Sequence, residues 1–199
     1  MERTVFFRAF EEEDAILIHQ WKNDDELNAL TVGLNKKTCL DEDTEWVKSH
    51  MRHHPYSAYW AVCSVETGKM IGWACLTDIH YINSSANFSG IVIGDKEFHD
   101  GLAWIETYLF GLEYGFERLN LNRIYGSAIV DHKLTLSMAE IMFQKTEGIF
   151  REAIYKNGRF YDEAVCAILK SEYFYHKNKG DYEIPAILKR ILEKKKKSK

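Results

Sequence analysis

Three closely spaced histidines are the first side chains that could carry chemistry: His50, His53 and His54. Zinc binding would need a fourth ligand in fixed geometry, which a segment ending at Pro55 does not promise, so we predict no metal site. The chain also lacks the phosphate-loop, dinucleotide, nucleophile-elbow and zinc-protease motifs G-x-x-x-x-G-K-[ST], G-x-G-x-x-G, G-x-S-x-G and H-E-x-x-H. The corresponding reaction classes are therefore disfavoured.

Other candidate residues lie where expected strands end. Cys75 lies in a β-rich segment with no activating base identifiable in the sequence, which favours a buried thiol over a nucleophile. Asp78 and His80 follow where that strand leaves the core, and such positions are commonly solvent-facing. The segment His99–Ala103 joins an apolar strand to a long helix, and the free N–H groups of a helix start can bind phosphate, although Asp100 would repel an anion.

The hydrophobic pattern predicts the elements that position these residues. Alternating or continuous apolar segments indicate strands, near-helical spacing indicates helices, and Asn157-Gly158 indicates a hairpin turn. The expected order is strand 4–10, helices 11–21 and 41–54, strands 59–65, 70–83 and 87–94, helix 102–119, strand 123–130, helix 135–143, and strands 148–155 and 160–170. This order predicts an α/β (α+β) fold with a mixed sheet of about seven strands flanked by helices.

Length and composition predict one globular domain. The chain has 199 residues, of which 46% are hydrophobic, and no internal change of composition divides it. We expect a single domain over residues 1–180, followed by a C-terminal helix and basic tail over 181–199. No apolar run approaches the roughly 20 residues that span a bilayer, and the four cysteines show no paired spacing. We therefore expect a cytoplasmic protein with reduced thiols and no membrane contact.

Charge is unevenly distributed. Residues 189–199 carry seven basic side chains and one acidic side chain, so the rest of the chain holds a net charge of -10 within the overall -4. An acidic body disfavours nucleic acid as a partner. Binding of nucleic acid by the lysine tail is an alternative that would require affinity to fall when residues 189–199 are removed.

Several phrases of the sequence, in their order and spacing, resemble the GNAT superfamily of acetyl-CoA-dependent N-acetyltransferases over nearly the whole chain. The branch it resembles holds the ribosomal-protein N-terminal, spermidine and pseudaminic-pathway amino-sugar acetyltransferases. The phrases are WKND at 21–24, IG at 71–72, DIHYIN at 78–83, GIVIGDKEF at 90–98, EYGFERLNLNRI at 113–124, EGIFREA at 147–153 and NGRFYD at 157–162. The resemblance implies a GNAT fold and direct attack of an amine on the acetyl thioester.

The resemblance also assigns a site for acetyl-CoA. The backbone of Ile91, Val92 and Ile93 would pair with the pantetheine, and the loop before the long helix would hold the diphosphate in a pattern R/Q-x-x-G-x-G/A. Aligned without gaps, His99, Leu102 and Trp104 occupy the three pattern positions, and none of them matches. A shift by one residue matches Gly101 and Ala103 but puts Phe98 at the first position. The residues expected to bind acetyl-CoA, the acyl donor, are Ile91, Val92, Ile93, His99, Asp100, Gly101, Leu102, Ala103 and Trp104.

Catalytic groups are carried over in the same way. The positions of the usual Asn and of the Tyr or Ser general acid fall on His132 and Ala139, with Ser137 as a nearby hydroxyl. Histidine can titrate near neutral pH. The acidic residue often found on the first splayed strand is Asn87 here. The resemblance therefore implies His132, Ser137 and Asn87 as catalytic candidates.

The expected acceptor is a primary amine of a small molecule, with a nucleotide-linked amino sugar ahead of a polyamine or a protein N-terminus. The resemblance places Trp21, Asn23, Cys75, Asp78 and His80 on the acceptor side. A homodimer is common in families of this kind. The alternative is a GNAT-fold binding module in which Trp104 fills the donor cleft and no acetyl group is transferred.

Overall fold

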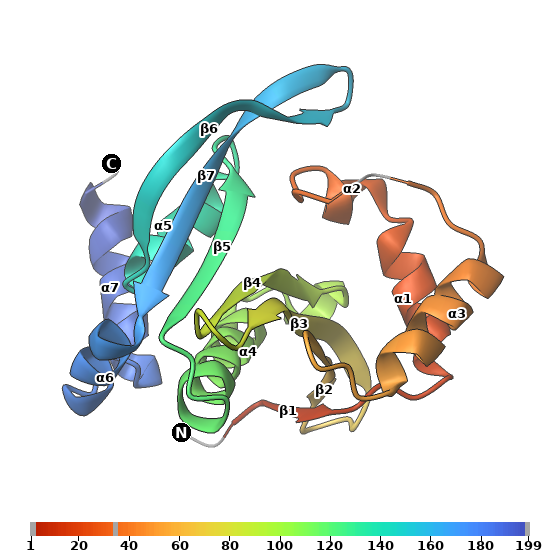
Figure 1. Ribbon diagram of the computed structural model, residues 1–199, viewed down its shortest axis with the longest axis horizontal. Helices are drawn as coiled ribbons and strands as arrows, with labels where there is room; N and C mark the ends of the chain where they lie inside the picture. The colour runs from red at the N-terminus through yellow and green to blue at the C-terminus, as the bar shows by residue number, and fades with distance from the viewer. Residues whose placement is uncertain (1–2, 34–35, 198–199) are drawn as a thin grey trace.

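The computed structural model describes residues 3–33 and 36–197, which form a mixed sheet with helices on both faces (Figure 1). In the described chain the sheet order is β1-β2-β3-β4-β5-β7-β6, and β4 and β5 are its one parallel pair. The predicted fold class, a mixed seven-strand sheet flanked by helices, is confirmed. The strands are β1 (Val5–Arg8), β2 (Ala58–Ser64), β3 (Met70–His80), β4 (Ser85–Ile93), β5 (Arg123–Ile129), β6 (Lys145–Lys156) and β7 (Arg159–Leu169).

The helices are α1 (Asp14–Lys22), α2 (Asp25–Asn28), α3 (Leu40–Met51), α4 (Leu102–Glu113), α5 (Lys133–Ile141), α6 (Lys170–Asn178) and α7 (Ile184–Lys197). Apart from shifts of up to three residues at the ends of α1, α3 and α5, the helices differ from expectation in three places. The predicted helix over 102–119 is α-helical to Glu113 and continues as a π-helical turn over Tyr114–Arg118. Helices α2 and α6 were not predicted. Helix α2 is a single turn capped by Asp24, and α6 has a polar sequence with weak apolar periodicity.

Two hydrophobic cores lie on opposite faces of the sheet. Successive residues of β2 point to opposite faces, so Val62 enters the core beneath α4, while Ala61 and Cys63 pack against α1 and α3. Ile187 of α7 is fully buried in the first core. The division of the chain at residue 180 stays a prediction, and residues 198–199 of the expected tail lie outside the described residues.

Within the ranges 3–33 and 36–197, no group of three or more His, Cys, Asp or Glu is arranged to hold a metal ion, and no helix is long and apolar enough to cross a membrane. His50 instead packs its ring 4.1 Å from that of Tyr59, and its Nδ1 lies 2.7 Å from the carbonyl oxygen of Trp46. All four cysteines are free thiols.

Candidate active site

A split in the sheet between β4 and β5 creates the candidate site. The two parallel strands pair only over Ser85–Asn87 and Arg123–Tyr125. Beyond that point β4 bulges: Cys75 pairs with Gly90 but Thr77 pairs with Asn87, so three residue steps on β4 face two on β3. A bulge bends its strand and increases its twist. The open end of β4 therefore turns away from β5, and its edge on that side is left without a strand partner.

A side-chain bridge holds the base of the split. The backbone N–H of Ser127 on β5 donates to Ser89 Oγ at 3.0 Å, and Ser89 donates through its hydroxyl and its backbone N–H to Asn87 Oδ1, at 2.6 and 2.9 Å. Asn87, expected in a catalytic role, thus fixes the bulge. Its amide oxygen lacks the basicity of a carboxylate, which makes Asn87 a positioning residue in this arrangement.

Gly72 lets β3 and the open end of β4 approach closely. A Cβ added at Gly72 would lie 2.1 Å from the carbonyl oxygen of Val92 and 2.9 Å from Ile93 Cα. We expect Gly72→Ala to lower the free energy of unfolding by about 3 kcal/mol, the upper end for overpacking, because backbone must move. Urea denaturation measures the loss. Gly148→Ala is the control, since a Cβ there meets no atom within 4 Å; equal effects of the two variants would contradict the prediction.

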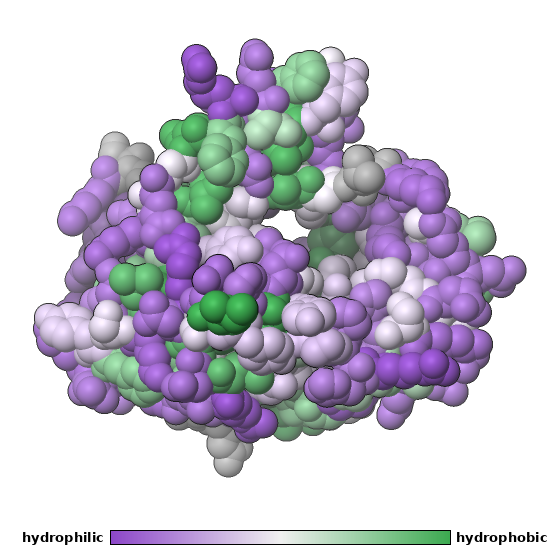
Figure 2. Space-filling view, in the orientation of Figure 1, coloured by the Kyte–Doolittle hydropathy of each residue, from purple (hydrophilic) through white to green (hydrophobic). Residues whose placement is uncertain are grey.

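A cavity of about 490 Å³ fills the split and continues toward α2. Figure 2 shows an opening beneath the β6–β7 hairpin. The walls of the cavity are mostly aromatic, aliphatic and hydroxyl side chains. The lining residues from the sheet and from α4 and α5 include Trp73, Cys75, Thr77, Asn87, Phe88, Ser89, Gly90, Ile91, Val92, Trp104, Tyr108, Ser127, His132, Thr135, Leu136, Ala139 and Cys166.

The cavity wall is poor in charge. Among the described lining residues none is Asp or Glu, and the two lysines, Lys22 and Lys36, are paired with Asp43 and Glu42. Burial raises the pKa of the Cys75 thiol to about 12, so this sulfur is protonated near neutral pH. A neutral buried thiol is not a nucleophile. Cys75 therefore contributes shape to the cavity wall.

Helix α5 brings a histidine and a hydroxyl to the cavity. His132 caps the helix, its Nδ1 accepting the N–H of Thr135 at 3.3 Å, and burial lowers the pKa of this imidazole. Its remaining proton therefore lies on Nε2 when the ring is neutral. Thr135 and Ala139 both line the cavity, because residues four apart share a helix face, whereas Ser137 does not line it. Sequence reasoning missed Thr135, which the spacing from Ala139 could have identified.

The loop before α4 is closed on itself. Gly101, at φ 93°, is the N-cap of α4, and Asp100 Oδ1 accepts the N–H of Leu102 at 2.8 Å. His99 Nε2 turns back to the carbonyl oxygen of Ile93, 2.8 Å away. Trp104 lines the cavity and stacks on Tyr108 with ring centroids 5.2 Å apart. Of the other residues expected to bind acetyl-CoA, Ile91 and Val92 line the cavity. Ile93 and Ala103 are buried and do not line it.

The expected acceptor residues separate into two groups. Cys75 lines the cavity, and the exposed Asp78 follows the lining residue Thr77, whose hydroxyl donates to the Asp78 carboxylate at 3.3 Å. Asp78 adopts φ 51°, a conformation uncommon for a non-glycine residue. His80 is exposed and accepts the N–H of Asn83. Trp21 and Asn23 are not among the residues that line the cavity.

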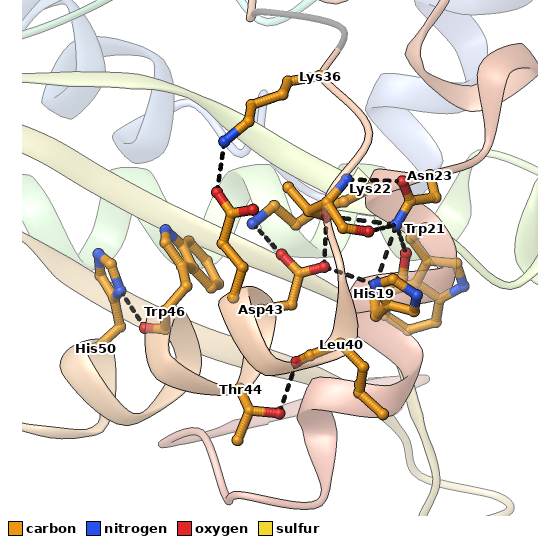
Figure 3. A network of polar contacts seen from close by, with 12 residues as sticks. His19, Trp21, Lys22, Asn23, Lys36, Leu40, Asp43, Thr44, Trp46 and His50 are labelled. Atoms are coloured by element: carbon orange, nitrogen blue, oxygen red, sulfur yellow. Dashed lines mark hydrogen bonds and ion pairs between the residues drawn. The ribbon is translucent and has the colours of Figure 1, made fainter.

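Trp21 and Asn23 belong instead to the packing of α1. Trp21 is buried against Gly94, where an added Cβ would lie 2.1 Å from the indole. Asn23 joins α1 to the segment before α3, donating to the carbonyl oxygens of His19 and Thr38 at 2.9 and 3.2 Å. These contacts lie in the polar network of Figure 3.

Asp43 is the centre of that network (Figure 3). Its carboxylate is fully buried and accepts hydrogen bonds from Lys22 Nζ at 2.5 Å, Thr38 Oγ1 at 2.6 Å and His19 Nδ1 at 2.8 Å. Burial acts to raise the pKa of Asp43, but these three donors together lower it. The carboxylate thus joins α3 to α1 and holds Lys22 at the cavity wall.

Hydrogen bonds from Lys156 to Thr31 and Gly33, which we call the Lys156 clasp, close the site on the side of α2. Lys156, at the tip of the β6–β7 hairpin, is 4% exposed and donates to Thr31 O, Thr31 Oγ1 and Gly33 O at 2.6, 2.9 and 3.1 Å. Thr31 and Gly33 both line the cavity. The hairpin therefore reaches across the split to the segment after α2, as Figure 1 shows.

Comparison with known proteins identifies the family of this chain. The model of the acetyltransferase (GNAT) domain matches residues 4–140, which is more than half of the chain. The chain belongs to the GNAT acetyltransferase family. This GNAT chain is an N-acetyltransferase with acetyl-CoA as its co-substrate, as the resemblance implied, and the alternative of a binding module without acetyl transfer is set aside.

Individual relatives of this GNAT chain agree with the assignment. Spermidine N(1)-acetyltransferase of Vibrio cholerae is 27% identical over 175 residues, which are 87% of this chain and 97% of the relative. A crystal structure of spermidine N-acetyltransferase from V. cholerae with CoA and spermine is similar with a TM-score of 0.77, at 27% identity over 86% of this chain and 98% of that one. A GNAT-family acetyltransferase of Bacillus anthracis, 21% identical over 86% and 98%, shares the fold with a TM-score of 0.72. Homodimer formation and a cytoplasmic location stay predictions.

Proposed function

We propose that this GNAT enzyme acetylates a primary amine of a small molecule that carries one cationic group. The observation that supports this acceptor is the cavity wall, which holds no carboxylate among its described residues. The spermidine-named relatives suggest a polyamine as the first alternative. A polyamine bound here would meet no carboxylate on the described wall for its additional ammonium groups, because Asp78 beside the cavity serves the reacting nitrogen, and buried unpaired charge is costly.

The reaction follows from the groups around the split. The amine nitrogen attacks the thioester carbon, and backbone N–H groups of β4 that have no strand partner beyond the bulge polarise the carbonyl. The carbon–sulfur bond then breaks, the thioester sulfur leaves as a thiolate that takes up a proton, and the nitrogen gives its second proton to water as the neutral amide forms. The attacking amine must first be neutral, and Asp78 beside the cavity is a carboxylate that can take its proton through water.

We infer that Thr135, oriented by His132, protonates the leaving sulfur. Thr135 lines the cavity on the helix face of Ala139, where the family alignment puts the general acid. His132 Nε2 lies 3.4 Å from Thr135 Oγ1, so the neutral ring can orient that oxygen as an acceptor and leave its proton free for the thiolate. Thr135 therefore takes the role expected of Ser137.

A nucleotide-linked amino sugar, the acceptor expected first from the sequence, gains no support from the comparisons. The two lysines that line the cavity are already paired with carboxylates. Neither is free to neutralise a diphosphate. We therefore place this acceptor behind a simple amine.

An acceptor panel tests the proposal. We expect acetyl-CoA and a monoamine such as 2-phenylethylamine to give kcat/KM at least tenfold above that for spermidine, with product measured by mass spectrometry. Tenfold corresponds to about 1.4 kcal/mol, a modest desolvation cost for two further charges. The variant Leu30→Glu, which adds a carboxylate to the wall, should shift the ratio toward spermidine. A preference of the unmodified enzyme for spermidine would refute the single-charge acceptor, and no transfer to any amine would refute the function itself.

A further inference from the structure

We propose that the enzyme binds its acyl donor through the pantetheine thioester and gains little affinity from the phosphorylated ADP half of CoA. The donor class is then acyl-pantetheine thioesters, of which acetyl-CoA is one member. This inference rests on the proposed function, because it concerns the donor side of the same cavity.

The start of α4 is already occupied by a carboxylate of the chain. The first N–H groups of a helix are a natural site for phosphate. Here Asp100 Oδ1 accepts the N–H of Leu102 at 2.8 Å, so one of these donors is used and a negative charge stands beside the others. A diphosphate placed there would lose a hydrogen-bond donor and meet a like charge.

The rest of the loop adds no free cation. Asp95 and Glu97 flank Lys96, whose ammonium is paired with Glu26 at 2.8 Å. His99 is the other basic side chain in the segment 95–100, and its Nε2 faces the carbonyl oxygen of Ile93. The cavity walls formed by the helix residues of α4 and α5 contain no Lys or Arg among the described residues. The loop is therefore acidic where a nucleotide would need positive charge.

The bulk of Leu102 and Trp104 also disfavours binding of the CoA diphosphate at the start of α4. Leu102 and Trp104 stand at positions where the family pattern has glycine or alanine, which allow backbone to approach a phosphate. The Trp104 indole is fixed by its stack on Tyr108, which in turn stacks on Phe88 at 5.6 Å. This ladder forms a flat apolar wall suited to an uncharged chain.

The inner cavity offers what pantetheine needs. Two buried groups on lining residues, the Trp73 Nε1–H and the Tyr108 hydroxyl, have no hydrogen-bond partner. Orphan buried donors are rare in folded proteins and indicate a missing partner. Both polar atoms are covered as the side chains stand. Pantetheine carries two amide carbonyls that accept hydrogen bonds, and a small rotation of either ring would bring its donor to a chain that lies against the aromatic wall.

Calorimetric titration with CoA and with pantetheine, which needs no acceptor, tests the inference. We expect the two dissociation constants to agree within tenfold. Asp100→Asn, which keeps a capping oxygen, should tighten CoA about fivefold at low salt and leave pantetheine unchanged, as expected for one charge about 4 Å from a phosphate. Glu66→Gln in the exposed β2–β3 turn is the charge-matched control and should change neither. Tyr108→Phe should weaken both ligands alike, about fivefold for one hydrogen bond.

Each result decides between the alternatives. A dissociation constant for CoA more than tenfold below that for pantetheine would overturn the inference, as would an Asp100→Asn effect shared by both ligands. Saturable binding of CoA would in that case leave the proposed function intact. No binding of either ligand at millimolar concentration would overturn the donor site, and with it the proposed function.

Discussion

The Thr135→Val variant is expected to fold normally and to lose about 100-fold in kcat, the lower end of the contribution of a general acid. Valine matches threonine in shape and removes only the hydroxyl of this lining residue. Because the proton is needed by the leaving sulfur, the loss should appear in kcat, with the dissociation constant for the donor unchanged. Steady-state kinetics with the best amine of the acceptor panel, together with calorimetry, separates the two.

Two further variants decide whether the hydroxyl acts as proposed. Thr135→Ser retains a hydroxyl on the same helix face and should recover most of kcat. If Ser137→Ala lost activity while Thr135→Val kept it, the role would return to the serine expected from the sequence. The lowered pKa of His132 gives a pH signature as well, since its neutral form persists above pH 6.5 and kcat should fall only at lower pH, as the ring becomes charged.

Asp43→Ala should strongly destabilise the packing of α1 against α3. Removing the fully buried carboxylate leaves three donors without their acceptor, and breaking a buried ion pair commonly costs 3–5 kcal/mol. We expect about 3 kcal/mol, because the side chains of His19 and Lys22 are 30% and 27% exposed and can regain water. For a chain of this length the melting temperature should fall by about 6–12 °C.

The same helix supplies the control for Asp43. Asp41 is exposed in the first turn of α3, and Asp41→Ala should cost less than about 1 kcal/mol, the value of its interaction with the helix dipole. Acid titration gives a second check. Because the folded protein lowers the pKa of Asp43, its contribution to stability is present above the ordinary aspartate pKa and is lost as pH falls through the lower, folded-state pKa. Comparable losses for Asp41→Ala and Asp43→Ala would show that burial of the carboxylate is not what matters.

Hydrophobic periodicity was sufficient to predict the sheet and its principal helices, because each strand and helix buries one regular face. It could not predict α2, a single turn that depends on the Asp24 cap, or the change from α to π geometry after Glu113. These features depend on local hydrogen bonds and tertiary packing, which apolar spacing does not record.

The site shows the same limit at the level of single residues. Alignment placed His132 and Ala139 at the cavity, and both line it. It chose Ser137 by proximity in sequence, although helical phase puts Thr135 on the relevant face. Asn23 matched a family phrase, but its hydrogen bonds hold α1 to the segment before α3. A shared phrase cannot distinguish a residue kept for packing from one that touches the substrate.

The Lys156 clasp gives the opening beneath the β6–β7 hairpin the form of a closed ring. Three oxygen atoms from Thr31 and Gly33 hold the ammonium, so the hairpin, the sheet and α1 with α2 form an unbroken frame around the opening. An opening of this kind limits the cross-section of a molecule that enters and sets no limit on its length. We expect slender linear amines to pass through it, and a branched molecule or a folded polypeptide to enter only when the contacts of Lys156 break.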